Sequence, residues 1–142
     1  MIRSDWLILW APRVLSVVRI MVALLFLEHG TSKLLNFPAG PNHPAMFTLS
    51  WVQGVIELVG GILLTLGLFT RPVAFILSGD MAVGYFMAHA PRGFFPMLNG
   101  GDAAILYCFI FLYIAAAGPG PWSLDAMMRG RADDPAYRRR SL

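Results

Sequence analysis

The sequence predicts an all-α, polytopic membrane protein: a bundle of four transmembrane helices with both termini in the cytoplasm. Its 142 residues are 57% hydrophobic and only 13% charged, and the mean hydropathy is +0.63. A soluble domain carries about 25% charged residues because its surface faces water. Since about 20 apolar residues span the hydrocarbon core of a bilayer, the chain is long enough for four crossings within one domain.

We expect the four spans at residues 13–35, 50–69, 72–90 and 100–117. Pro12 suits a first helical turn, and the proline-rich stretch Asn36–Pro44 forms the first loop. Asn99–Asp102 caps the fourth span, and Gly118–Pro121 ends it. The third and fourth spans are close to the shortest length that crosses a bilayer, so flanking residues such as 99–102 should complete them.

The C-terminal part begins with a short helix at the membrane interface. The sequence predicts this helix from Trp122 to Met128, with Ser123 as its N-cap. The membrane domain then covers residues 1–125, and residues 126–142 form a basic cytoplasmic tail.

The lysines and arginines are unequally divided between the two sides of the membrane. Lys33 and Arg92 lie on one side, and Arg19 lies within the first span. The positive-inside rule places the side with more cations in the cytoplasm. This topology accounts for the net charge of +3, so no nucleic-acid partner is expected. The cations on the side of the termini are Arg3, Arg13, Arg71, Arg129, Arg131, Arg138, Arg139 and Arg140.

The sequence lacks the residues that two classes of function require. Membrane thiol oxidoreductases need paired cysteines, whereas this chain has only Cys108. Nucleotide sites need a glycine-rich phosphate loop before a helix, and the sequence contains none.

Ionisable side chains inside spans are costly, which makes them functional candidates. Arg19 and Asp80 lie nearer the cytoplasmic ends of their spans, whereas most of the others fall in the outer half. At 100° per residue, Glu28 points away from the face that Arg19 and Lys33 share. Asp80 and His89 are half a turn apart, so only a distorted helix lets both face one site. The outer candidates for a site are Glu28, His29, Lys33, Glu57, Tyr85, His89, Asn99 and Asp102.

A structural role is one hypothesis for this polar cluster. Arg19 would pair with Asp80, and Glu57 would pair with Lys33 or His89. Each ion would neutralise another, which fixes the register of the bundle.

A binding pocket for a small apolar redox molecule such as a quinone is the second hypothesis. Its carbonyls would accept hydrogen bonds from donors placed among phenylalanines, as is typical of such pockets. The donors would be His29, Lys33, Tyr85 and His89.

A metal site is the third hypothesis. Glu28, His29, Glu57 and His89 together offer two imidazoles and two carboxylates. The sequence lacks a closely spaced ligand motif, so metal is the weakest of the three.

A family resemblance favours the second hypothesis. The order of motifs along the chain resembles the DoxX family of small membrane proteins, although Gly100–Asp102 stands where many relatives have Gly-Gly-Glu. The motifs are Phe26–Leu34, Glu57–Leu64, Gly67–Pro72, Met81–His89, Asn99–Asp102 and Trp122–Asp125. The resemblance implies a four-helix protein of a bacterial-type inner membrane. Relatives are linked to a terminal quinol oxidase, to thiosulfate:quinone oxidoreduction, to quinone resistance and to oxidative-stress complexes, and an animal relative assists channel assembly.

The leading expectation is therefore the membrane subunit of a redox or detoxification system that binds a quinone-like or other small apolar redox molecule in its outer half. If it is an enzyme, it is a quinone-linked oxidoreductase subunit. Its partners are the bilayer and the proteins of a redox complex, with a homo-oligomer as a further option. The alternatives are a non-catalytic scaffold or assembly factor and, after that, a metal-binding membrane protein.

Overall fold

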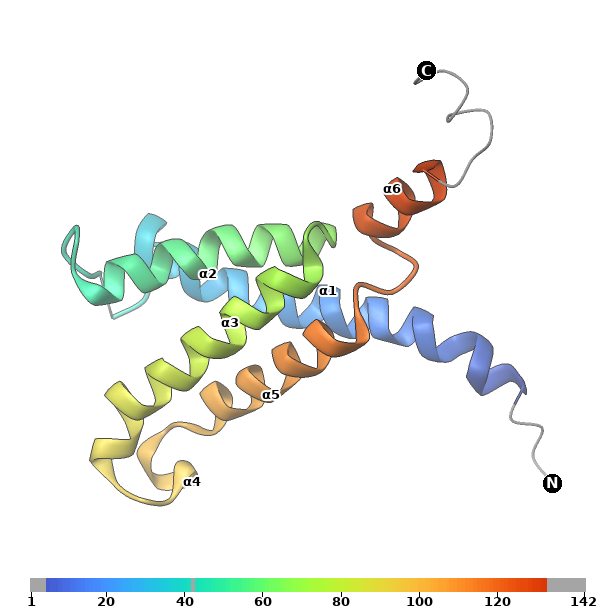
Figure 1. Cartoon of the computed structure of the whole chain (residues 1–142). Helices are drawn as coiled ribbons and strands as arrows, with labels where there is room; N and C mark the ends of the chain where they lie inside the picture. The colour runs from blue at the N-terminus through green and yellow to red at the C-terminus, as the bar shows by residue number, and fades with distance from the viewer. Residues whose placement is uncertain (1–4, 42, 133–142) are drawn as a thin grey trace.

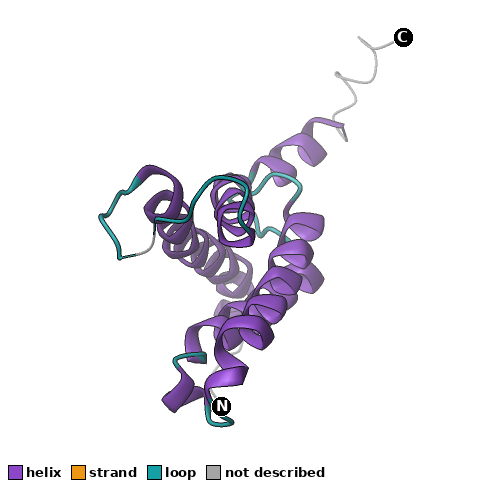
Figure 2. Ribbon diagram, turned by 90° about the vertical axis from the view of Figure 1, so that its left-hand side faces the viewer, coloured by secondary structure: helices purple, strands orange, loops and turns teal. Residues whose placement is uncertain are grey.

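The computed structural model describes residues 5–41 and 43–132, and within these ranges it is all helical, with no strand (Figure 2). The predicted all-α class is confirmed. Arg3, Asn42 and residues 133–142, which include Arg138, Arg139 and Arg140, lie outside the described residues. The helices are α1 Asp5–Leu35, α2 Leu49–Leu66, α3 Thr70–Gly84, the π-helical η1 Tyr85–His89, the 3-10 helix η2 Ala90–Arg92, α4 Pro96–Asn99, α5 Asp102–Ala117 and α6 Leu124–Ala132.

Three helical segments are long and apolar enough to cross a membrane: residues 6–35, 49–66 and 70–92. The fourth apolar helix, α5, has 16 residues, or about 24 Å of helix at 1.5 Å per residue. Residues 99–101 do not lengthen it, contrary to the prediction, because Gly100 has a positive φ of 73° and separates α4 from α5, which begins at Asp102. α5 nevertheless runs back beside α3, so the chain is a polytopic membrane bundle (Figure 1).

The bundle consists of two hairpins that diverge from one end (Figure 1). α1 packs mainly on α2, and α3 packs mainly on α5. The hairpins meet where α2 turns into α3, and we call this the closed end; they separate toward the opposite, open end. The start of α1 and α6 both lie at the closed end, as an even number of crossings requires. The sequence predicts that the closed end faces the cytoplasm.

Glycines allow the two helices of the first hairpin to approach closely. A Cβ on Gly30 would lie 2.5 Å from the backbone nitrogen of Leu58, and a Cβ on Gly61 would lie 2.9 Å from the Cα of Leu27. Small residues permit this backbone contact between membrane helices. The buried apolar core of the described residues, formed by Ala23, Phe26, Leu64, Ala74, Leu77, Met81, Phe111 and Ile114, joins the two hairpins.

α1 begins earlier than predicted, at Asp5, and contains Pro12 inside the helix rather than in its first turn. Proline lacks an N–H and removes one helical hydrogen bond. Residues around Pro12 are exposed, and Arg13 donates to the carbonyl of Leu9 at 3.1 Å. The helix continues through Pro12 to Leu35.

Arg19 does not pair with Asp80, contrary to the prediction. Its guanidinium is fully buried and donates to the carbonyls of Pro119 and Trp122, the latter at 2.6 Å. These carbonyls belong to the turn between α5 and α6, where no helical N–H is available to them. Arg19 thus fastens the turn between α5 and α6 to α1.

Asp125 on α6 fastens the start of α3. Its two carboxylate oxygens accept hydrogen bonds from the backbone N–H of Phe69 at 3.0 Å and Thr70 at 2.9 Å. Burial raises the pKa of Asp125, but these hydrogen bonds and the charge of Arg129 together hold the pKa below its ordinary value. The ionised carboxylate is therefore the form that the fold favours.

The short helix predicted after the fourth span forms, with the expected cap. Ser123 Oγ accepts a hydrogen bond from the N–H of Ala126 at 3.1 Å. α6 continues to Ala132, so the first residues of the predicted tail, 126–132, are helical.

Candidate functional site

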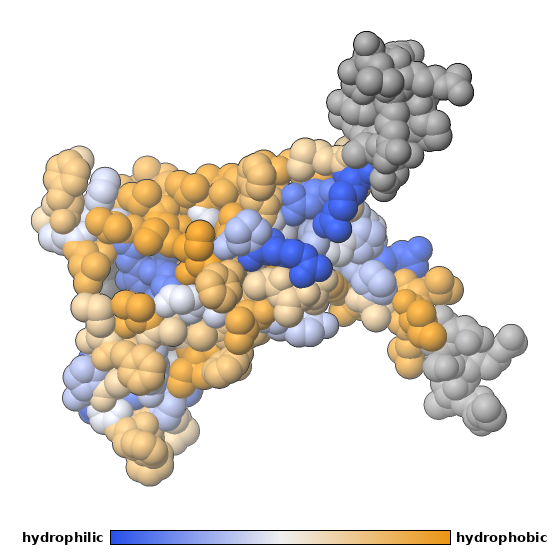
Figure 3. Space-filling view, in the orientation of Figure 1, coloured by the Kyte–Doolittle hydropathy of each residue, from blue (hydrophilic) through white to orange (hydrophobic). Residues whose placement is uncertain are grey.

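A cleft of about 440 Å³ lies between the two hairpins in the open half of the molecule. Figure 3 shows hydrophilic colour recessed between the two arms at that end. We call it the outer cleft, because the sequence predicts that this half lies toward the outside. It is lined by Phe26, His29, Lys33, Ser50, Gln53, Glu57, Met81, Gly84, Ala88, His89, Arg92, Gly100, Ala103, Ala104 and Tyr107.

An ion pair joins α1 to α2 in the wall of the cleft. Lys33 Nζ lies 2.7 Å from Glu57 Oε1 and donates to Gln53 Oε1 at 3.3 Å. Of the two partners expected for Glu57, the structure selects Lys33. The Glu57 side chain is 3% exposed and that of Lys33 19%. The second oxygen of Glu57, Oε2, is buried and makes no hydrogen bond to the described residues.

Asp80 lies beside this pair rather than beside Arg19. Asp80 is close enough to Glu57 and Lys33 to interact electrostatically with their charges, and it lies near the polar side chain of Gln53. Its Oδ2 is also buried without a hydrogen-bond partner among the described residues. The cluster thus combines two carboxylates with one ammonium group, and it has acceptor oxygens to spare.

A π-helical turn directs His89 into the cleft. Its i→i+5 bond runs from the N–H of Ala90 to the carbonyl of Tyr85. A π turn holds more residues than an α turn and shifts the phase of those that follow, and such turns are frequent at functional sites. The expected distortion of the third span is therefore present, although Asp80 itself does not line the cleft. His89 consequently lines the same cleft as Glu57.

Hydrogen bonds define what the two imidazoles offer to a ligand. His29 Nδ1 lies 2.9 Å from the carbonyl of Leu25, and His89 Nδ1 lies 3.1 Å from the carbonyl of Asn99. A carbonyl oxygen can only accept, so each Nδ1 carries the hydrogen. In the neutral imidazole the remaining nitrogen, Nε2, is then an acceptor. The sequence-based hypothesis has these histidines donate hydrogen bonds to a ligand carbonyl. In the neutral form, their Nε2 atoms would instead accept hydrogen bonds from a ligand.

Asn99 and Tyr85 shape the mouth of the cleft without lining it. Asn99 is 3% exposed; its Nδ2 donates to the carbonyl of Gly93 at 2.8 Å, and its Oδ1 accepts from the N–H of Gly101 at 2.8 Å. Tyr85 stacks on the ring of His89 with 6.3 Å between centroids. Both predicted ligand residues instead hold the loop after the π turn and orient His89.

Glu28 and Asp102 lie outside the cleft, contrary to the prediction. Glu28 is exposed on another face of α1, next to Thr31 and Pro38. Asp102 is exposed in the first turn of α5, and Gly101 rather than Asp102 is the N-cap. The helix phase already separated Glu28 from Lys33, whereas the position of Asp102 depended on the turn before α5.

The described residues contain no group of three His, Cys, Asp or Glu side chains placed to hold a metal ion. All four residues of the metal hypothesis are described, and Glu28 faces away from His29, Glu57 and His89. The structure therefore does not assemble that ligand set.

Tyr107 is a cleft residue that the site prediction omitted. It stands on α5, across from α1, with its ring 5.4 Å from that of Phe26 and 5.9 Å from that of His29. The sequence offered one indication of this role, because Tyr107 is a partly polar residue among the apolar residues of the last span. Gln53 was also omitted, although it shares a helical face with Glu57.

Residues 14–90 match the model of the DoxX family. A protein of Haemophilus influenzae described as uncharacterized is 49% identical over 122 residues, which are 82% of this chain and 91% of that protein. A Mycobacterium tuberculosis membrane protein, also described as uncharacterized, is 31% identical over 134 residues, 81% of each chain. The inner membrane protein YphA of Escherichia coli is 29% identical over 130 residues, 80% of this chain and 89% of YphA. No solved structure matches the chain.

Proposed function

The chain belongs to the DoxX family of membrane proteins, and from this premise we propose that it binds a quinone-like molecule, in its hydroxyl-bearing reduced form, in the outer cleft. In this proposal the protein is the membrane subunit of a larger redox or detoxification system in a bacterial inner membrane. The inner-membrane setting draws on the similarity to YphA. The ligand class rests on the chemistry of the cleft.

The unpartnered Oε2 of buried Glu57 is the observation that carries the proposal. A buried acceptor without a donor costs free energy, and a hydrogen bond to a charged group contributes about 1.5–3 kcal/mol. The imidazoles of His29 and His89, whose Nδ1 atoms face backbone carbonyls, each add an acceptor Nε2 to the same cleft in the neutral form. Three acceptors fit a ligand that donates hydrogen bonds, and the hydroxyl groups of a hydroquinone are such donors.

Apolar side chains complete the fit. Phe26, Met81 and Tyr107 line the cleft beside its polar wall. Aromatic rings prefer tilted or offset contact with one another, as Phe26 and Tyr107 already show at an interplanar angle of 59°. The volume of about 440 Å³ lies within the range of about 300–1,000 Å³ that small-ligand sites occupy. A hydroquinone ring would therefore meet apolar faces and hydrogen-bond acceptors together.

The position of the cleft suits a ligand dissolved in the bilayer. It opens between two hairpins whose outward surfaces are apolar. A molecule with an apolar tail can enter between the hairpins and leave its tail in lipid.

Binding of a short-tailed benzoquinol to the purified protein tests the proposal. We expect Glu57→Gln to weaken binding at least tenfold, because it removes the charged acceptor. Glu28→Gln makes the same chemical change outside the cleft and should bind like the wild type. His89→Leu, which removes a different acceptor, should also weaken binding. Equal affinities for Glu57→Gln, Glu28→Gln and the wild type, with all three folded by circular dichroism, would refute the proposal.

A non-catalytic scaffold is the second candidate function, and one observation favours it. The pair of Lys33 and Glu57 links two helices directly, as a structural device would. In that case Glu57→Gln lowers the melting temperature and the recovery of co-purifying partners, while the affinity for the benzoquinol stays the same. The two candidates therefore differ in the binding measurement.

A further inference from the structure

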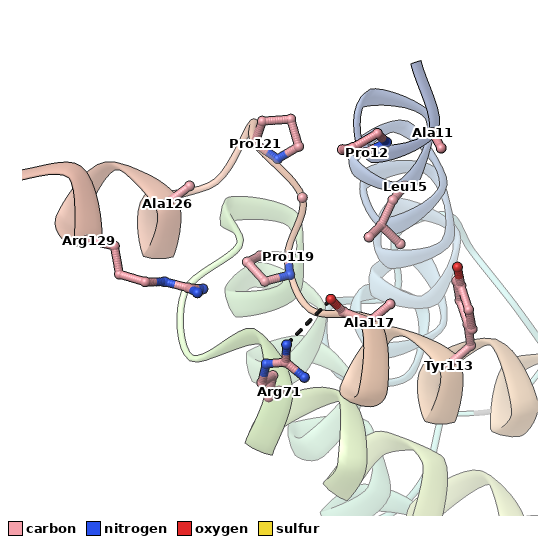
Figure 4. Close-up of a pocket in the computed structure, with 11 residues that line it drawn as sticks. Ala11, Pro12, Leu15, Arg71, Tyr113, Ala117, Pro119, Pro121, Ala126 and Arg129 are labelled. Atoms are coloured by element: carbon pink, nitrogen blue, oxygen red, sulfur yellow. Dashed lines mark hydrogen bonds between the residues drawn. The ribbon is translucent and has the colours of Figure 1, made fainter. Parts of the chain in front are cut away.

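A second cavity, of about 610 Å³, lies at the closed end between α1, the end of α5 and α6 (Figure 4). Its charged side chains are Arg71 and Arg129, and the Tyr113 hydroxyl group adds a polar atom. Among the described residues that line it, none is acidic. The cavity is therefore suited to an anion.

The two guanidinium groups reach the cavity from different helices. Arg71, near the start of α3, is held by the last carbonyls of α5 at 2.5–2.9 Å. Arg129 extends from α6 toward the segment that carries Pro119 (Figure 4). Asp125, one turn before Arg129, is engaged by backbone N–H groups of α3 and does not line the cavity. Its carboxylate therefore does not occupy the space between the two arginines.

An apolar groove of about 460 Å³ adjoins the cavity along α1. Ala11, Leu15 and Tyr113 line both hollows, which places them side by side. Trp6 and Trp10 line the end of the groove toward the start of α1 and are about half exposed, and Val18 lines its other end. Tryptophan is enriched at the membrane–water interface, so the groove runs from that interface into the apolar layer.

We propose that these adjoining hollows bind one anionic phospholipid of the leaflet at the closed end. Its phosphate lies at Arg71 and Arg129, and an acyl chain lies along the groove of α1. Guanidinium groups match phosphate in shape and charge, and clustered cations at the cytoplasmic surface attract anionic lipids. A free phosphate ion would use the arginines but leave the groove uncovered. A phospholipid has both an anionic headgroup and an apolar chain, so it is the occupant that matches both hollows.

Quenching of tryptophan fluorescence by brominated lipid tests this site. The whole chain carries Trp51→Phe and Trp122→Phe, so that the fluorescence comes from Trp6 and Trp10 alone. It is titrated in neutral micelles with brominated phosphatidylglycerol or brominated phosphatidylcholine. We expect brominated phosphatidylglycerol to reach half-maximal quenching at a mole fraction at least fivefold lower than brominated phosphatidylcholine does. Arg129→Gln should reduce this ratio about fivefold.

Two further variants separate the site from general attraction. Arg139→Gln removes the same charge from the basic tail that the sequence predicts, and it should leave the preference unchanged. Ala11→Phe fills the junction of the two hollows and should weaken quenching by phosphatidylglycerol without a change in charge. Equal quenching by the two lipids, or equal losses in Arg129→Gln and Arg139→Gln, would overturn the proposal. Loss of the preference on addition of inorganic phosphate, with Ala11→Phe unaffected, would assign the arginines to a soluble anion and also overturn it.

Discussion

The ion pair between Lys33 and Glu57 gives the sharpest test of how the first hairpin is held together. Replacing each residue by methionine, singly and together, removes the charges while keeping long side chains. A single replacement leaves one charge in the wall of the cleft without its partner. The double replacement leaves no unpaired charge, so the structure predicts that the two effects do not add.

The magnitude follows from the separation of 2.7 Å between Nζ and Oε1. At an effective dielectric constant of about 20, two unit charges at that distance attract by about 6 kcal/mol. Desolvation of the buried carboxylate offsets much of this attraction. Removing one partner of a buried pair typically costs about 3–5 kcal/mol, and the partial exposure of Lys33, 19%, favours the lower figure. We expect a loss of about 3 kcal/mol for either single variant, and a loss in the double variant at least 2 kcal/mol smaller than the sum.

Reversible unfolding in mixed micelles, followed by circular dichroism, gives the four free energies of the cycle. Glu28→Met is the matched control, because it removes a carboxylate from an exposed position of the same helix pair, and its cost should stay within about 0.5 kcal/mol. If the losses of Lys33→Met and Glu57→Met add within about 0.5 kcal/mol, the two residues are uncoupled. That result would refute the reasoning from their geometry.

Two more predictions concern the glycine contact and the closed end. Gly30→Ala should lower the free energy of unfolding by about 1–3 kcal/mol, because its methyl group would meet the backbone of Leu58. The control is Gly79→Ala, whose methyl group would meet no atom within 4 Å, and it should cause no loss in the same unfolding measurement. Equal losses in the two variants would contradict the close approach of α1 and α2. Asp125 has a pKa below its ordinary value in the folded protein, so its stabilisation is fully present above about pH 4 and is lost as the pH falls through the folded pKa. Asp125→Asn should therefore cost about 1 kcal/mol at neutral pH and less in acid, and a difference in melting temperature that does not shrink on acidification would contradict this assignment.

Much of the fold can be predicted from local properties of the sequence. Low charge and four apolar stretches predicted the membrane bundle, because the cost of placing a segment in lipid is summed residue by residue. The N-cap at Ser123 was predictable for a similar reason, since the cap bonds to an N–H only three residues away. Helix phase alone also separated Glu28 from Lys33.

The tertiary structure decided which of these residues meet. Arg19 faces carbonyls of the turn after α5 rather than Asp80, and nothing local to Arg19 specifies where that turn lies. His89 joins Glu57 in the outer cleft because a π turn changes its phase. The sequence determined that costly polar groups lie within the spans, since composition and periodicity are local. Their partners depend on how the hairpins pack, because a buried charge is satisfied by whichever groups the other helices bring to it.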